Sequence, residues 1–196
     1  RLASAYSPSE EPWHFEQFGR KVLACKNNNV IQQWTMGISV HFEDLTKKDK
    51  DGNIVSTAPT AKAMAIVRDF VVAGNIGAGD DPNLVKWSNL NEEGEWRSVS
   101  EGAAQSQADF QFIADGGAIQ NITGGEIGII FMDEAIYRMS YVGSPLFFQF
   151  DKISTIGCFA GGSVIEDNGT SYYLAKDGFY MTDGNAVTAI GAGKVD

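Results

Sequence analysis

The hydrophobic and polar positions of this chain repeat one arrangement four times: a short apolar segment, a tight polar turn and a second strand-like segment. The segments alternate apolar and polar residues or are rich in β-branched and aromatic residues, which is typical of β-strands. Each unit therefore predicts an antiparallel pair of strands. The four predicted pairs span residues 18–36, 69–89, 128–142 and 171–190.

The spacing of these units predicts the fold. If Val22, Val71, Ile129 and Tyr173 are equivalent positions, successive units are 49, 58 and 44 residues apart. A supersecondary unit with such a period is the sequence signature of β-propeller blades, because each small sheet buries its faces against its neighbours. We therefore predict an all-β, β-propeller-like fold of antiparallel hairpins over the single region 1–196. We also expect this region to be part of a larger chain that closes the propeller.

The segments between the units are polar and rich in turn formers. Residues 43–60 are charged and predict a hairpin insertion that extends from the body, with its turn near Asp51-Gly52. Residues 1–17 predict a loop that leads into the first unit, and residues 94–113 predict a connection between units. No long amphipathic helical pattern occurs in the sequence.

Two aromatic residues are expected to pack between blades. Trp87 and Tyr137 each lie on the second strand of their unit and have apolar or aromatic neighbours two residues away. The alternative is that they stack on a ligand. The two cysteines, Cys25 and Cys158, lie in or beside apolar strands, and we expect buried free thiols in a protein made in a reducing cytoplasm.

The overall charge restricts the classes of partner that we expect. Acidic residues outnumber basic residues by 25 to 15, which gives a formal net charge of −10. Tight binding to nucleic acid through phosphate neutralisation needs clustered Lys and Arg, so the balance argues against it. No apolar run approaches the length of a membrane helix, and we predict no membrane insertion.

The recognisable motifs are incomplete. A calcium loop that started at Asp49 would need Gly at its sixth position and Glu at its twelfth, but Ile54 and Thr60 stand there. The glycines near residues 77 and 191 match neither a dinucleotide fingerprint nor a phosphate loop. Two histidines without a CxxC motif argue against zinc.

Two acidic pairs, Asp133-Glu134 and Glu166-Asp167, are the best candidates for the two carboxylates of a glycosidase. Both pairs are predicted to lie at hairpin turns, where acidic residues are common as solvated turn formers. The sequence therefore predicts no catalytic, cofactor-binding or metal-ligating residues, and no enzyme activity.

From about Val67 to its end, the chain resembles a known family. The most specific stretch is residues 135–150, with Tyr137-Arg138-Met139 and Gly143-Ser144-Pro145 ahead of FFQF. The DGFY element at 177–180 and the IGAGK element at 190–194 add to it. Together they resemble the tail tubular protein B, or tail nozzle, family of tailed-phage virion proteins, which bears a β-propeller.

The resemblance implies a structural role in a virion. A member of this family would form a homo-oligomeric ring below the portal and adaptor and would contact other tail proteins such as the adaptor and tail fibre. It would pass DNA only as transiting cargo during ejection, after being made in the host bacterial cytoplasm. Two alternatives remain open: a non-viral β-propeller scaffold for protein interactions and, less favoured, a propeller hydrolase.

Overall fold

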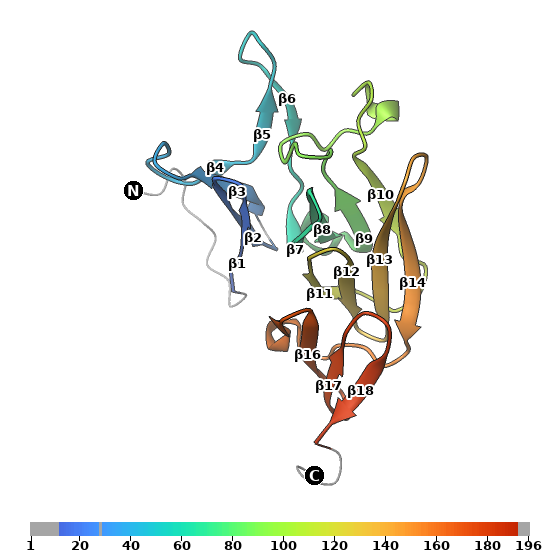
Figure 1. Ribbon diagram of the computed structural model, residues 1–196. Coiled ribbons are helices and arrows are strands. Elements are labelled where there is room, and N and C mark those ends of the chain that lie inside the picture. Colours follow the sequence, from blue (N-terminus) through green and yellow to red (C-terminus); the bar gives the residue numbers. More distant parts are fainter. Residues whose placement is uncertain (1–11, 28, 192–196) are drawn as a thin grey trace.

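The computed structural model describes residues 12–27 and 29–191, and these form an all-β protein (Figure 1). The predicted all-β class and the antiparallel hairpins are confirmed. Four sheets have four strands each, and a fifth sheet is a two-stranded hairpin. The described residues contain no α-helix, and three short 3-10 turns, η1 (Gly77–Gly79), η2 (Val99–Glu101) and η3 (Gly161–Ser163), lie between strands.

The four-stranded sheets follow one another along the chain and are called blades 1 to 4. Blade 1 consists of β1 (His14–Phe18), β2 (Lys21–Lys26), β3 (Asn29–Thr35) and β4 (Glu43–Asp44). Blade 2 consists of β7 (Ala61–Val67), β8 (Phe70–Ile76), β9 (Asp81–Trp87) and β10 (Asp109–Phe112). Blade 3 consists of β11 (Ile119–Thr123), β12 (Gly128–Met132), β13 (Ile136–Gly143) and β14 (Phe147–Ser154). Blade 4 consists of β15 (Ile165–Asp167), β16 (Thr170–Ala175), β17 (Gly178–Thr182) and β18 (Val187–Ile190).

Within each blade the strands pair in chain order. The predicted strand pairs correspond to the second and third strands of the four blades, for example Val22 opposite Trp34 in blade 1. The hairpin of β5 (Thr46–Lys48) and β6 (Ile54–Thr57) lies within residues 43–60 and extends away from the blades (Figure 1). Residues 43 and 44 of that range form β4, the last strand of blade 1.

Two segments predicted as loops are strands. Residues 14–17 belong to β1, which pairs with β2 along its whole length. Residues 109–112, predicted as part of a connection, form β10 at the outer edge of blade 2. Both strands gain their stability from pairing with a neighbour, which local composition does not reveal. Residues 1–11 of the predicted lead-in loop lie outside the described residues.

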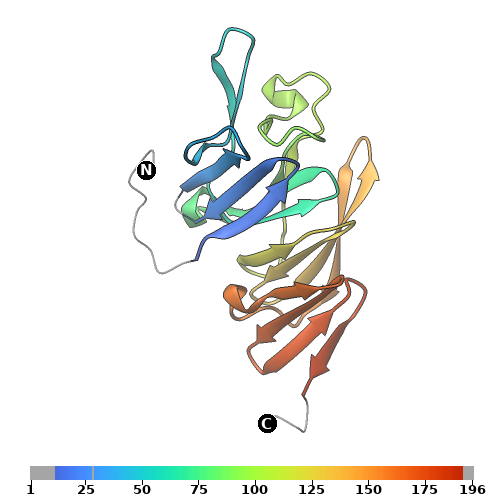
Figure 2. The same cartoon turned by 60° about the vertical axis from the view of Figure 1, so that its left-hand side comes forward.

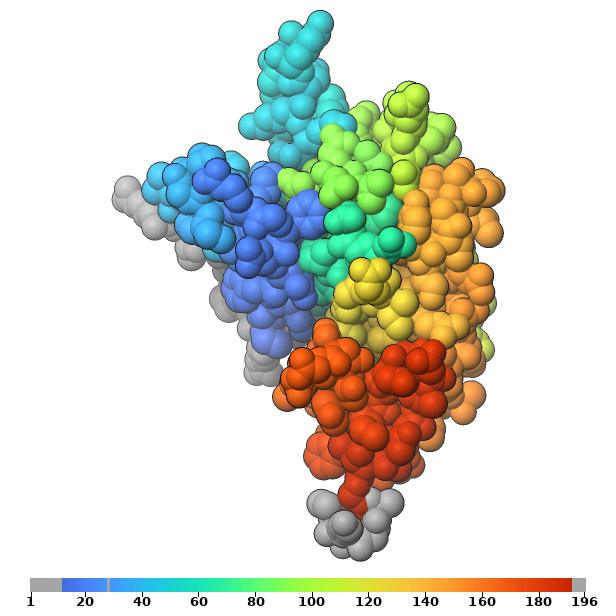
Figure 3. All heavy atoms as spheres, viewed as in Figure 1, coloured from blue at the N-terminus to red at the C-terminus, as the bar shows by residue number. Residues whose placement is uncertain are grey.

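The blades are stacked as a fan (Figures 1 and 2). We call the face that a blade turns toward the next blade its front, and the opposite face its back. Buried side chains join the front of each blade to the back of the next, in three separate clusters. The first strands of blades 1, 2 and 3 lie side by side, and β7 contacts both β1 and β11. In the space-filling view, consecutive blades form one continuous body (Figure 3).

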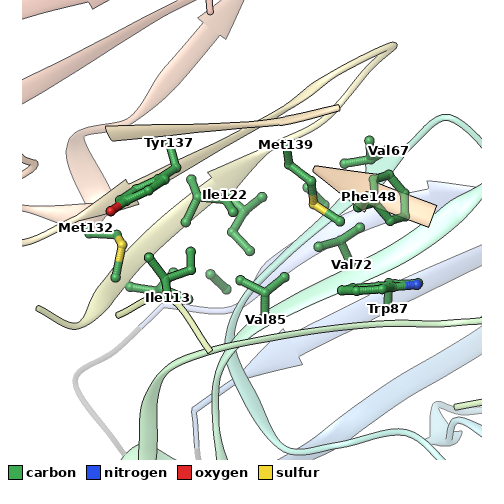
Figure 4. Packing of buried hydrophobic residues seen from close by; sticks show 14 of the residues in the cluster. Val67, Val72, Val85, Trp87, Ile113, Ile122, Met132, Tyr137, Met139 and Phe148 are labelled. Atoms are coloured by element: carbon green, nitrogen blue, oxygen red, sulfur yellow. The ribbon is translucent and has the colours of Figure 1, made fainter. Parts of the chain in front are cut away.

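The junction between blades 2 and 3 contains the largest cluster, shown in Figure 4. Trp87 projects from the front of blade 2, and its ring meets Phe148 of blade 3 edge-on, with ring centroids 5.2 Å apart. The indole Nε1 donates to the carbonyl of Gln107 at 2.7 Å. Tyr137 belongs to the same cluster from the blade 3 side. The expectation that both aromatic residues pack between blades is confirmed.

Main-chain contacts add to this junction. The backbone N–H of Gly125 donates to the Ile66 carbonyl at 2.9 Å, and the N–H of Arg68 donates to the Gly125 carbonyl at 2.7 Å. These bonds form a parallel bridge between Val67 and Gly125. Gly124 allows the approach, because a Cβ atom there would lie 2.0 Å from the Ile66 carbonyl oxygen.

Both cysteines are buried and free, as the sequence predicts. The Cys25 thiol donates to the carbonyl of Ala61 at 2.8 Å, and burial raises its pKa to about 12. Burial also raises the pKa of Cys158. Neither thiol is therefore a ready nucleophile at neutral pH. Within the described part of the chain, no helix is long and apolar enough to cross a membrane.

Candidate interaction surfaces

A cavity of about 540 Å³ lies where blade 4 meets blade 3 and the loop after β10. Four turns or loops and the end of β14 surround it. Its lining carries both acidic and basic side chains. The charged residues are Asp115, Asp133, Glu134, Lys152, Lys176 and Asp177.

The carboxylates of this cavity are engaged in structural contacts. Asp115 accepts hydrogen bonds from Lys152, at 2.6 Å, and from the Tyr137 hydroxyl, and both contacts lower the pKa of its carboxyl. Burial, followed by the bond to Asp115, raises the pKa of Tyr137 to about 12. Asp133 accepts from the Ala118 N–H at 2.9 Å and so anchors the chain ahead of β11. These contacts hold loops in place and keep Asp115 ionised.

The two acidic pairs proposed for a glycosidase have different settings. Asp133-Glu134 forms the turn between β12 and β13, as predicted, and lines the cavity. Glu166-Asp167 lies in strand β15, so its prediction as a hairpin turn was wrong. Burial raises the pKa of Glu16 on β1, and the nearby charge of Glu166 raises it further. The described residues contain no cluster of three or more His, Cys, Asp or Glu that could hold a metal ion.

Acidic residues between β9 and β10 of blade 2 form ion pairs with Lys47 of the hairpin. Lys47 lies 2.6 Å from Glu92 and 3.0 Å from Glu95. Glu95 also receives two hydrogen bonds from the Arg97 guanidinium, at 2.8 and 2.9 Å. Burial raises the pKa of Glu95, but the bonds from Arg97 and Lys47 outweigh it and lower that pKa to about 2. This network fixes the hairpin to the body.

An open strand edge forms the first candidate surface. β10 is the last strand of blade 2 and pairs only with β9. Phe110 and Phe112 project from the same side of β10, are exposed, and meet edge-on with ring centroids 6.1 Å apart. An exposed aromatic pair on a strand whose outer edge pairs with no other described strand is suited to binding an extended peptide. The sequence analysis missed this surface because it assigned these residues to a connection.

The front face of blade 4 forms the second candidate surface. Successive strands place Ile165, Tyr172, Phe179 and Met181 on the face turned away from blade 3. The first three are exposed, whereas Tyr173 and Tyr180 on the back face are buried against blade 3. A shallow depression of about 230 Å³ runs along this front face beside Tyr172 and Met181.

No known protein-family profile matches the chain, and no curated protein matches its sequence. Among solved structures, the chain is similar to dihydro-heme d1 dehydrogenase NirN in complex with DHE, with 11% identity and a TM-score of 0.52. That similarity covers 93% of this chain and 37% of the NirN chain. It is also similar to Kluyveromyces lactis Hsv2, with 7% identity and a TM-score of 0.44 over 86% of this chain and 46% of that one.

NirN contains a β-propeller, so the predicted β-propeller-like fold is confirmed. At 11% identity the likeness to NirN shows the fold alone. The chain spans just over a third of the length of the NirN chain that it matches. A propeller fold hosts many unrelated functions, so function must be argued from the surfaces described above.

Proposed function

We propose that this protein is a β-propeller scaffold that binds other proteins at the outer edges of its blades. The observation that carries the proposal is the open edge of β10 with its exposed pair Phe110 and Phe112. The charged groups of the cavity between blades 3 and 4 support it, because their hydrogen bonds and ion pairs hold loops in place. The partner at β10 is an extended segment that adds as a fifth strand to blade 2.

The partner would bind by adding a strand to the edge of β10. Backbone N–H and C=O groups on the outer edge of β10 bond to the backbone of the partner, which supplies affinity with little dependence on sequence. The partner displaces two side-chain hydrogen bonds, from the Phe110 N–H to Asp109 and from Gln111 to the Phe112 carbonyl. Apolar side chains at alternate positions of the partner then cover Phe110 and Phe112. Burial of one such aromatic side chain contributes about 1.5–3 kcal/mol.

A photo-crosslinking residue in place of Gln111, between the two phenylalanines, tests the proposal. In cells that produce the protein, we expect a specific adduct that mass spectrometry identifies as one partner protein. Replacing Phe110 and Phe112 with Ser should abolish the adduct while the circular dichroism spectrum stays unchanged. The control places the same crosslinker at Leu146, an exposed residue of the β13–β14 loop. The same adducts at both positions would contradict a specific edge site.

The second candidate is a ring protein of a phage tail. It rests on the resemblance of residues 67–196 to the tail nozzle family and on an acidic balance of charge, which suits a conduit that DNA passes without binding. Its location would be the virion, with adaptor and tail fibre proteins as neighbours. Mass spectrometry of purified virions tests this candidate function. Detection of the protein in stoichiometric amount supports the tail role, and absence of the protein from intact virions rejects that role.

A further inference from the structure

The two faces of β10 differ in chemistry. β10 forms the outer edge of blade 2 (Figure 1). Asp109 lies opposite Trp87, which faces blade 3, so Asp109 and Gln111 belong to the front of blade 2. Phe110 and Phe112 alternate with them and belong to the back. A strand added at this edge therefore meets polar side chains on one face and aromatic rings on the other.

The two phenylalanines also direct their backbone groups outward. Just after β10, the N–H of Ile113 donates to the carbonyl of Asn83 on β9 at 3.0 Å. Residues of an antiparallel strand alternate in the direction of their N–H and C=O groups. Phe110 and Phe112, at the other positions, therefore turn these groups away from β9 and toward an added strand.

Two of these outward groups bond to side chains of the same strand. The Phe110 N–H donates to the Asp109 carboxylate at 2.9 Å, and the Gln111 amide donates to the Phe112 carbonyl at 2.8 Å. An added strand competes for both backbone groups. The Asp109 carboxylate then loses the N–H that it accepts from, and a half-buried charge without a donor is costly.

The charges beside the edge are unequal on the two faces. On the back, Lys86 lies opposite Phe110. A hydrogen bond from the Ser98 N–H lowers the pKa of Glu101, and the nearby charge of Lys86 lowers it further, so Lys86 has an acidic neighbour. On the front, Asp109 forms no ion pair with any described residue. A cation on the front face is thus the group that complements this edge.

We propose that the segment bound at β10 alternates basic and apolar residues: a Lys or Arg opposite Asp109, and apolar residues opposite Phe110 and Phe112. This inference rests on the proposed function, because it specifies the partner of the same site. Directly opposite residues of paired strands share a face, with Cβ atoms about 4.5–5.5 Å apart, so a basic side chain there reaches the carboxylate. The backbone of the partner takes over the Phe110 N–H, and the basic side chain gives Asp109 a charged donor in its place.

Titration of isotopically labelled protein with short peptides tests the proposal by nuclear magnetic resonance. Binding is followed at the amide signals of Phe110 and Phe112. The probe is the peptide Lys-Val-Thr-Val-Lys, which presents the same pattern to β10 in either strand direction. At about 0.05 M salt it should bind about two- to fivefold more tightly than Gln-Val-Thr-Val-Gln, and added salt should reduce that ratio. Lys-Ser-Thr-Ser-Lys controls for general attraction to an acidic protein and should leave both signals unshifted.

Substitutions at Asp109 assign the preference to one carboxylate. Asp109→Asn keeps an oxygen that can accept from the Phe110 N–H and removes only the charge, so the Lys and Gln peptides should bind equally. Asp109→Lys should reverse the preference, with Glu-Val-Thr-Val-Glu binding more tightly than Lys-Val-Thr-Val-Lys. Asp51→Asn is the matched control, because it removes the same charge at an exposed turn of the hairpin. It should keep the preference of the unaltered protein, and the amide spectrum of each variant verifies its fold.

Equal affinities of the unaltered protein for the Lys and Gln peptides overturn the proposal and leave the edge site intact. A preference for the Lys peptide that persists in Asp109→Asn also overturns it. Replacing Phe110 and Phe112 with Ser should abolish binding of every peptide. If no peptide shifts the signals of β10 in the unaltered protein, the edge site itself is rejected. Failure of the charge pattern and failure of the proposed function therefore give different results.

Discussion

A methyl group at Gly124 should separate blade 3 from blade 2. The Cβ atom of Gly124→Ala would lie 2.0 Å from the carbonyl oxygen of Ile66 and 2.8 Å from its carbon. Ordinary contact begins above 3.4 Å, so one backbone must move by more than 1 Å. The obstacle is backbone within a paired strand, which a change of rotamer cannot relieve.

That displacement breaks identifiable bonds. The N–H of Gly125 would lose the Ile66 carbonyl, and the N–H of Arg68 would lose the Gly125 carbonyl. Each lost bond costs about 0.5–1.5 kcal/mol, and more where a buried group stays unpaired. Poorer packing in the cluster between blades 2 and 3 adds about 1–3 kcal/mol. We expect a total loss of about 3–5 kcal/mol in the free energy of unfolding.

Thermal and urea unfolding measure this loss. For a chain of this length, 1 kcal/mol lowers the melting temperature by about 2–4 °C, so Gly124→Ala should lower it by about 6–20 °C. Gly162→Ala is the control, since no atom lies within 4 Å of its added Cβ, and it should melt within about 2 °C of the unaltered protein. Equal melting temperatures for the two variants would refute the argument.

Three other outcomes are expected. Trp87→Ala removes the ring packed on Phe148 and should cost about 3–5 kcal/mol of stability, and a variant with unchanged melting would favour a ligand-stacking role for Trp87. Glu95 has a folded-state pKa of about 2, below its ordinary 4.5, so its contribution is present above pH 4.5 and is lost as the pH falls toward 2. Glu95→Gln should therefore destabilise by about 2 kcal/mol at pH 7, with the difference between the two proteins shrinking over that window in pH-dependent urea titrations. The protein should show no measurable affinity for duplex DNA in a fluorescence anisotropy titration at about 0.15 M salt, and binding tighter than about 10⁻⁶ M would reject the view that its acidic charge excludes phosphate binding.

The centre of each blade could be predicted from the sequence, whereas its edges could not. Segments such as GIIFM at 128–132 are apolar throughout because both of their faces are buried, and a polar turn follows. The edge strands have weaker hydrophobic patterns in the sequence. β15 (Ile165–Asp167) has three exposed residues, and β1 mixes aromatic and polar residues, since pairing with a neighbour stabilises both.

The surfaces were harder to predict than the fold. Phe179 and Tyr172 have the composition of core residues, and only the order of the blades shows that nothing in the described chain covers them. The closeness of Glu16 to Glu166 depends on two blades far apart in the sequence. The exposed pair on β10 follows from the end of a sheet, which composition does not reveal.

Because the blades are stacked, their local stability against unfolding should differ from blade to blade. Each blade contacts only its neighbours, so local stability follows from the junctions on either side of it. Blade 3 is covered on both faces, whereas blade 4 is attached to the described chain by the smallest of the three clusters. In an isolated chain, backbone amides of β16 and β17 should therefore exchange with solvent through partial unfolding well before those of β8 and β12. A neighbour on the front of blade 4 would slow that exchange without changing a residue of the chain.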